Sequence, residues 1–194
     1  MLFLINIGTQ PIHTERLLLR RFTVADASAA YHNWQNDPVV TRYLTWPAYT
    51  SLAPAKTRMA LTAASYRQPD VYQWAMQLTD PAATLIGNIS VVSHDDDLQT
   101  MAIGYVMGQT WWGHGYMPEA LRAVIDYLFS GTDVNRIEAR HDTHNPNSGK
   151  VMHKAGMQFE GVLRQRGLNN TGLCDEAFYA ILRSDWTEKH RQND

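Results

Sequence analysis

The segment "TWWGHGYMPEAL" (Thr110–Leu121) contains the residues best suited to bind a charged ligand. Gly113 and Gly115 stand just before an apolar stripe with helical spacing, so we expect them at the start of a helix. The first turn of a helix has unpaired N–H groups and a positive dipole end, and glycines let a ligand approach both closely. The segment therefore predicts a cradle for an anion, a diphosphate in particular. A plain turn with both glycines at positive φ is the alternative.

The residues beside these glycines exclude two better-known phosphate loops. A Walker A loop needs Lys and then Ser or Thr after its last glycine, whereas Tyr116 and Met117 stand there. A dinucleotide-binding fingerprint needs a small third residue at the position of Pro118. Pro118 instead suits the first turn of a helix, where its missing N–H costs little.

The elements around this segment predict an α+β fold that positions the cradle between strands. We expect strands over residues 14–22, 71–78, 84–92, 100–107, 136–142, 157–168 and 175–186, and helices over about 24–35 with Thr23 as its cap, 38–44, 51–67, 116–130 and 147–155. The strands over 71–107 predict an antiparallel meander. The strand, helix and strand from residue 100 to residue 142 predict a crossover with a parallel pair.

Length and composition indicate one globular domain. The chain has 194 residues, 44% of them hydrophobic, and a net charge of −2, which argues against a dedicated nucleic-acid partner. We expect a single domain over residues 1–194, with 1–13 as a short extension or edge strand. No signal peptide or membrane-spanning run is evident, so we expect a cytoplasmic protein without a membrane partner. Cys174 is the only cysteine, which rules out an internal disulfide.

In order and spacing, the motifs from Thr14 to Leu182 resemble the GNAT acyl-CoA N-acyltransferases, and among them the RimJ/RimL-like branch. The matching segments are "TERLLLRRF", "LIGNISVV", "AIGYVM", "WWGHGYMPEAL", "NRIEARHD", "NPNSGKVMHKAGMQFEG" and "FYAIL". The resemblance implies the GNAT fold: a central mixed, mostly antiparallel sheet with a splayed parallel pair and helices on both faces. It also implies acetyl-CoA as the co-substrate and no metal.

The resemblance further implies where acetyl-CoA binds. The pantetheine arm would enter between the strands 103–107 and 136–142 and pair with the backbone of one of them. Lys150 and Lys154 are candidates for the adenosine end, with a solvated helix face as the alternative. The implied cofactor-binding residues are Val106, Met107, Trp112, Gly113, His114, Gly115, Tyr116, Met117, Asn145 and Ser148.

Acetyl transfer to an amine needs an oxyanion donor, a proton for the leaving thiolate and an uncharged amine. A backbone N–H near Val106 is the expected oxyanion donor. Family members often have a tyrosine as the acid at the position of Met152, so Ser148 is the remaining hydroxyl, with helix capping as its alternative role.

The base is open, because Ala102 and Gly167 stand where relatives carry acids. His94 is our candidate for it, with Asp95–Asp97 or water as alternatives.

The sequence thus predicts an N-acetyltransferase that moves an acetyl group to a primary amine, on a protein N-terminus such as that of a ribosomal protein or on a small molecule. A GNAT-fold module that binds acyl-CoA without turnover is the alternative. A homodimer stays open. His141 and His144 suggest a metal site, which we reject because no third ligand has suitable spacing.

Overall fold

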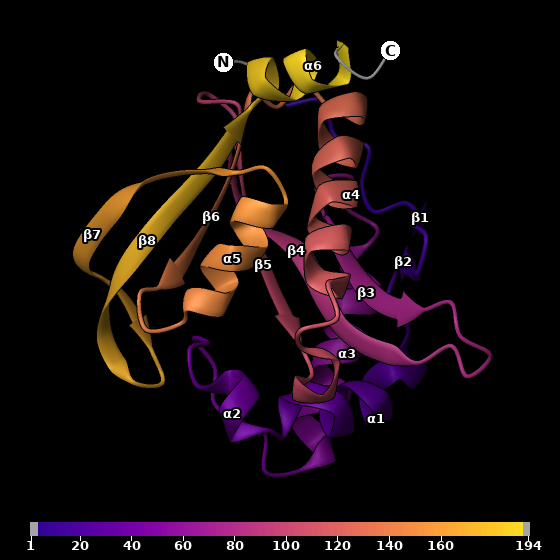
Figure 1. The fold of residues 1–194 in the computed structure, drawn as a ribbon. Coiled ribbons are helices and arrows are strands. Elements are labelled where there is room, and N and C mark those ends of the chain that lie inside the picture. The colour runs from indigo at the N-terminus through magenta and orange to yellow at the C-terminus, as the bar shows by residue number, and fades with distance from the viewer. Residues whose placement is uncertain (1–3, 192–194) are drawn as a thin grey trace.

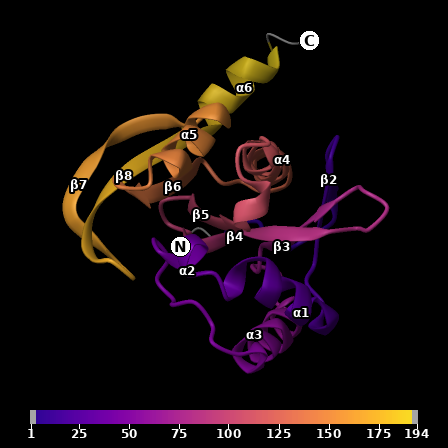
Figure 2. The same cartoon turned by 60° about the horizontal axis from the view of Figure 1, so that its bottom comes forward.

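The computed structural model describes residues 4–191. In this range the strands form one eight-stranded sheet in the order β1-β2-β3-β4-β5-β6-β8-β7. Helices α4 and α5 cover one face of the sheet, and α1, α2 and α3 lie on the other (Figures 1 and 2). This is the expected α+β GNAT architecture.

The strands follow the expected order with small shifts at their ends. Their bounds are β1 Ile12–His13, β2 Leu17–Arg20, β3 Gln73–Leu78, β4 Leu85–Asp95, β5 Thr100–Met107, β6 Arg136–Asp142, β7 Gln158–Asn169 and β8 Gly172–Leu182. The strands β3, β4 and β5 form the expected antiparallel meander. β5 and β6 are the one parallel pair among the described strands.

The helices are α1 Ala27–Ala30, α2 Pro38–Thr41, α3 Leu52–Ser65, α4 Tyr116–Gly131, α5 Pro146–Lys154 and α6 Arg183–Arg191. A 3-10 turn, η1 (Val24–Asp26), precedes α1, and a π-helical turn, η2 (Tyr31–Gln35), continues it. Another 3-10 turn, η3 (Gln109–Trp111), links β5 to the glycine segment. The one helix expected after Thr23, over about 24–35, is therefore three short pieces.

The parallel pair opens towards the start of α4. Only Thr100, Met101 and Ala102 of β5 pair with β6, opposite residues 136–138. Beyond Ala102 the two strands separate, while β8 pairs with the other edge of β6 along its whole length (Figure 1). The splay is the gap into which the resemblance places the pantetheine arm.

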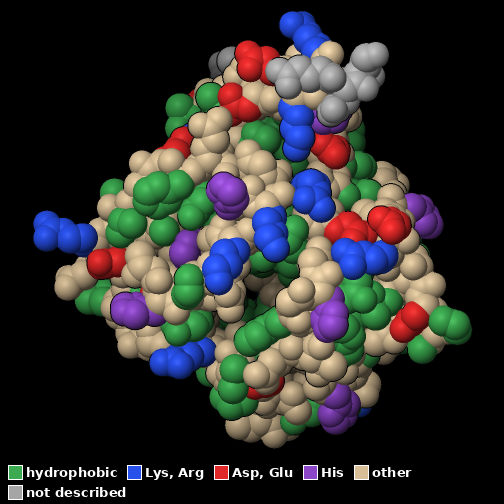
Figure 3. All heavy atoms as spheres, viewed as in Figure 1, with side chains coloured by type: hydrophobic (Ala, Val, Ile, Leu, Met, Phe, Trp, Pro, Cys, Tyr) green, Lys and Arg blue, Asp and Glu red, His purple; other side chains and the backbone are tan. Residues whose placement is uncertain are grey.

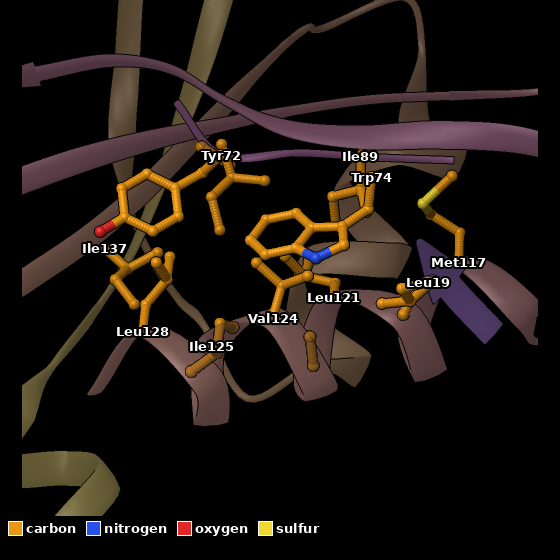
Figure 4. Packing of buried hydrophobic residues seen from close by; sticks show 14 of the residues in the cluster. Leu19, Tyr72, Trp74, Ile89, Met117, Leu121, Val124, Ile125, Leu128 and Ile137 are labelled. Atoms are coloured by element: carbon orange, nitrogen blue, oxygen red, sulfur yellow. The ribbon is translucent and has the colours of Figure 1, made fainter. Parts of the chain in front are cut away.

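The larger hydrophobic core lies between the sheet and α4. The helix contributes fully buried Leu121, Val124 and Leu128, which pack towards Trp74 and Ile137 of the sheet (Figure 4). Burying a side chain of this size stabilises the fold by about 2 kcal/mol. A second core, which includes Phe22, Trp34 and Met59, fills the space between the sheet and α1–α3. The two cores hold the open end of the sheet in place from both faces.

The expectation for the C-terminus was wrong: β8 ends at Leu182, and residues 183–191 form α6 rather than a longer strand. Arg183 explains this end, because its guanidinium donates to the carbonyls of Phe129, Thr132 and Val134 at the end of α4. Asp185 accepts the Leu182 N–H at 3.1 Å. The chain must turn at this point to make these bonds.

The described part of the N-terminal extension also packs against the domain. Leu4 is buried, Ile12 and His13 pair with β2, and Thr9 bonds to the backbone of Val71. Met1 to Phe3 lie outside the described residues.

Candidate active site

The glycine segment has the backbone that its sequence predicts. Gly113 has φ = +83° and Gly115 has φ = +81°, and Gly115 is the N-cap of α4. A side chain at Gly113 would meet no atom within 4 Å. Glycine is therefore favoured there by the positive φ and by the approach of a ligand to the backbone, and not by tight packing. The first turn of α4 thus keeps its N–H groups open to a ligand.

Arg16 adds a positive charge at this helix start, which the sequence alone did not reveal. Its Nη1 donates to the His114 carbonyl at 3.0 Å, and its guanidinium lies 4.7 Å from the centroid of the Tyr116 ring. A Cβ at Gly115 would lie 3.5 Å from Nη2 of Arg16. The cradle therefore combines helix N–H groups with an arginine, which suits a diphosphate.

More cations surround this region. Arg122 belongs to α4, while Lys150 and Lys154 belong to α5. Figure 3 shows Lys and Arg side chains gathered over these two helices beside a hollow in the surface. The face that presents the glycine segment is therefore locally basic in a chain whose net charge is −2, as an anionic ligand requires.

Glu119 holds Arg16 in place from the first turn of α4. Its Oε1 accepts from Thr14 Oγ1 at 2.6 Å, and its Oε2 accepts from Arg16 Nε at 2.7 Å. Burial alone would raise the pKa of Glu119, but the hydrogen bonds from Thr14 and Arg16 and the Arg16 charge together lower it. The ionised form is thus favoured in the folded state.

We expect Glu119→Gln to lower the free energy of unfolding by about 1–2 kcal/mol at pH 7. A lowered folded-state pKa stabilises the fold above the unfolded value of about 4.3 and loses that effect as pH falls below it. Urea unfolding of parent and variant between pH 7 and pH 3.5 measures this. A difference that stays constant over the whole range would contradict the assignment.

The register of β4 and β5 corrects the expected role of Val106. Gly108 N donates to the Ile86 carbonyl at 2.9 Å, and the Val106 carbonyl lies against Gly87. In a strand the N–H and C=O of one residue point the same way, so the Val106 backbone faces β4 rather than the gap.

The N–H groups of Tyr105 and Met107 point into the gap instead. The carbonyl of Met107 also faces away from β4, but it already accepts from Trp112 Nε1 at 2.7 Å. Trp112, an expected cofactor contact, therefore fixes the end of β5. The N–H groups of Tyr105 and Met107, rather than that of Val106, are therefore the candidates for the oxyanion donor.

Ser148 lies where α5 faces β5, and its hydroxyl has a partner that the sequence did not reveal. The Tyr105 hydroxyl donates to the Ser148 carbonyl at 3.0 Å and lies 2.9 Å from Ser148 Oγ. Burial raises the pKa of Tyr105 well above its usual range, so the phenol stays protonated. The N-cap of α5 is Asn145, whose side chain makes no capping bond, and Ser148 sits inside the first turn.

Other expected residues lie further from the gap. Met152 and Met117 are buried in the core. His94 stands near the β4–β5 turn, its ring 3.7 Å from Asp96, at the end of the sheet where β5 and β6 are still paired. Neither of the two cavities at the splay includes His94 or Asp95–Asp97 among its lining residues. His94 thus lies away from the cavities at the splay, and its role as the base stays a prediction that this geometry does not favour.

These two neighbouring cavities adjoin the gap between β5 and β6. The first, of about 190 Å³, reaches from β5 across the gap to β6, β7 and β8, and carries Glu138, Asp142 and Glu176. The second, of about 160 Å³, lies between β4, β5 and the α1–α3 side and carries Trp46 and Arg58. The two share the lining residues Leu44, Thr45, Val92 and Gly104.

A bridge of hydrogen bonds joins two segments that line these cavities. Asn170, in the β7–β8 turn, donates through Nδ2 to the carbonyls of Thr41 and Trp46, each at 2.8 Å. Its backbone N–H donates to the Leu44 carbonyl at 3.1 Å. The bridge thus joins the loop after α2 to the C-terminal hairpin, two segments far apart in the sequence.

The acetyltransferase (GNAT) domain family matches residues 16–158. The chain belongs to the GNAT acetyltransferase family. Members of this family transfer the acetyl group of acetyl-CoA to an amine, and this chain is an acetyl-CoA-dependent N-acetyltransferase. Its RimJ-like character agrees with its similarity to a ribosomal-protein acetyltransferase.

This GNAT chain is 32% identical over 172 residues to the uncharacterized N-acetyltransferase YoaA of Bacillus subtilis, covering 89% of this chain and 96% of that protein. It is 35% identical over 85 residues to the [ribosomal protein uS5]-alanine N-acetyltransferase of Escherichia coli, covering 44% of each. A GNAT-family acetyltransferase structure from Bacillus anthracis superimposes with a TM-score of 0.78 at 26% identity, covering 90% of this chain and 99% of that one.

Two further findings concern residues 4–191 only. No group of three or more His, Cys, Asp or Glu side chains in this range could hold a metal ion; His144 Nδ1 instead lies 3.0 Å from Asp142 Oδ1. None of the helices in the same range has the length and apolar character needed to cross a membrane.

Proposed function

We propose that this GNAT enzyme acetylates the α-amino group at the end of a peptide chain, as found at a protein N-terminus. The observation that carries the proposal is the pair of cavities at the splay, which share the lining residues Leu44, Thr45, Val92 and Gly104 and together would form an acceptor path. Carboxylates gather at one end of this path, where an amine would meet the thioester. Polar groups that suit a peptide backbone line the other end.

The second cavity has unmet hydrogen-bonding capacity. Trp34 Nε1 and Gln35 Oε1, both on the π-helical turn, are buried and have no partner among the described residues. Asn88 and Ser90 of β4 line the same cavity. A peptide brings both N–H donors and C=O acceptors, so it can satisfy an indole donor and an amide acceptor together. A simple alkylamine offers no carbonyl for the indole.

The α4 face would hold the co-substrate while the acceptor approaches from the α1–α3 face. The glycine segment with Arg16 would hold the diphosphate of acetyl-CoA, and the β5 backbone would pair with pantetheine. A gap-facing N–H of Tyr105 or Met107 would stabilise the oxyanion. When the Tyr105 phenol donates to Ser148 Oγ rather than to the Ser148 carbonyl, the Ser148 hydroxyl hydrogen would be free to donate to the leaving sulfur. The name of the uS5-alanine relative is consistent with a peptide acceptor.

Thiol release from acetyl-CoA with a panel of amines tests this proposal. We expect a short peptide with a free N-terminal alanine to give a kcat/KM at least about tenfold above that of a free amino acid, a polyamine or an aminoglycoside, a difference of about 1.4 kcal/mol. An N-formylated copy of the peptide that contains a lysine is the control and should be inactive. Preference for a small amine, or acetylation of the lysine alone, would overturn the peptide assignment.

A further inference from the structure

Three carboxylates line the first cavity, and two of them already accept hydrogen bonds from other residues of the protein. Glu138 accepts from Arg136 Nε at 3.0 Å. Asp142 accepts from the His144 backbone N–H at 2.8 Å through Oδ1 and from Asn169 Nδ2 at 2.7 Å through Oδ2. These two side chains are part of the cavity wall, and their carboxylates already have cationic or polar partners within the protein.

Glu176 of β8 is different. Its Oε1 accepts from Arg140 Nε at 3.1 Å, but its Oε2 is buried and has no hydrogen-bond partner among the described residues. Leaving a buried charged oxygen without a donor is costly, so such an atom in a native structure calls for an explanation. A ligand that brings an N–H donor would supply the missing partner.

Gly167 allows the carboxylate to occupy this position. A Cβ at Gly167 would lie 2.6 Å from Glu176 Oε1, 2.7 Å from Cδ and 2.8 Å from Cγ. The pairing of β7 with β8 shifts register between Leu163 and Gly167 at the same place. A glycine and a bulge in β7 thus make room for one glutamate of the neighbouring strand.

Two small residues of β5 line the same cavity. Ala102 and Gly104 leave space there at the edge of the splay. The cavity therefore combines a carboxylate, small residues and the gap for the thioester between the two strands. This is the arrangement that an ammonium group needs on its way to the thioester.

We propose that Glu176 binds the acceptor ammonium and takes its proton, and so is the base that Ala102, Gly167 and His94 do not provide. This inference rests on the proposed function and assigns a residue within the same site. Arg140 is a positioning residue, because it holds one carboxylate oxygen and leaves the other for the amine.

The transfer conserves atoms and charge. The ammonium R–NH₃⁺ gives one proton to the Glu176 carboxylate, and the free amine attacks the thioester carbonyl carbon to form the C–N bond. The C–S bond then breaks. The nitrogen loses its second proton, one proton ends on the CoA thiolate and the other is released to water. The products are the N-acetyl amide and CoA.

Glu176→Gln tests the proposal because it keeps the side-chain shape and removes the charge. We expect kcat/KM for the peptide amine at pH 7 to fall about 30-fold or more, within the range usual for loss of a general base. The deficit should shrink as pH rises past the amine pKa of about 8, since water then supplies free amine. Calorimetric affinity for CoA should stay unchanged.

Two further variants complete the design. Glu160→Gln is the matched control, because Glu160 is an ion-paired glutamate of the same hairpin, bound to Arg136, that lines neither cavity; it should keep parental kcat/KM. Gly167→Ala should displace the Glu176 carboxylate and reproduce the pH-dependent loss even if the glutamine variant fails to fold. Activity within about threefold of parent at every pH in both Glu176→Gln and Gly167→Ala would overturn the proposal. A parent chain that acetylates no peptide would instead refute the proposed function.

Discussion

Replacing Gly115 with valine is expected to weaken CoA binding at least about tenfold, or 1.4 kcal/mol. Gly115 has φ = +81°, a conformation that valine adopts only with strain, and a side chain there would also approach Arg16. Both effects disturb the helix start that is proposed to hold the diphosphate. Titration calorimetry with CoA measures the loss directly.

Gly172→Val is the matched control for that experiment. Gly172 has φ = +103° at the start of β8, and a Cβ added there would meet no atom within 4 Å, so the variant tests the strain of valine at positive φ alone. We expect a similar drop in thermal stability and an unchanged affinity for CoA. Unchanged affinity in a folded Gly115→Val protein would show that the diphosphate binds elsewhere.

The second large effect is expected from Ser148→Ala, which should lower kcat by roughly tenfold to a hundredfold and change the acetyl-CoA KM much less. A contact with the leaving sulfur strengthens as negative charge develops there, so its loss appears in kcat. Tyr105→Phe should shift kcat in the same direction, because the phenol lies 2.9 Å from Ser148 Oγ. Steady-state kinetics with one confirmed amine gives both parameters.

Ser148→Thr keeps a hydroxyl and is the control, with kcat expected closer to the parent. Helix capping is the alternative role for Ser148, and the structure gives that place to Asn145 instead. Equal kcat values for the parent and the alanine variant would leave Ser148 with a purely structural role in α5.

Local sequence signals predict most of the fold. The apolar stripe of α4, the glycines before it and the β5 and β6 runs are all found from the sequence, because each depends on residues close together in the chain. The N-terminal helix and the last strand are predicted less accurately. A π-helical turn interrupts the former and the Arg183 contacts with α4 end the latter, and both depend on packing between distant segments.

The catalytic groups are harder to predict for the same reason. Periodicity does not reveal which way a strand backbone faces, so the sequence places Val106 in the gap although its carbonyl lies against Gly87. His94 has a suitable residue type, but the sheet puts it at the end away from the splay, which the sequence does not reveal. Glu176 carries no motif, since its environment arises only where β8 lies beside Gly167 of β7.

The Asn170 bridge has a consequence for how an acceptor reaches the gap. Its three hydrogen bonds tie the loop after α2, whose Leu44 and Thr45 line both cavities, to the hairpin of β7 and β8. Rupture of three neutral hydrogen bonds costs about 3 kcal/mol in total. An acceptor that binds against this loop is therefore expected to meet a wall that the end of the chain holds in place.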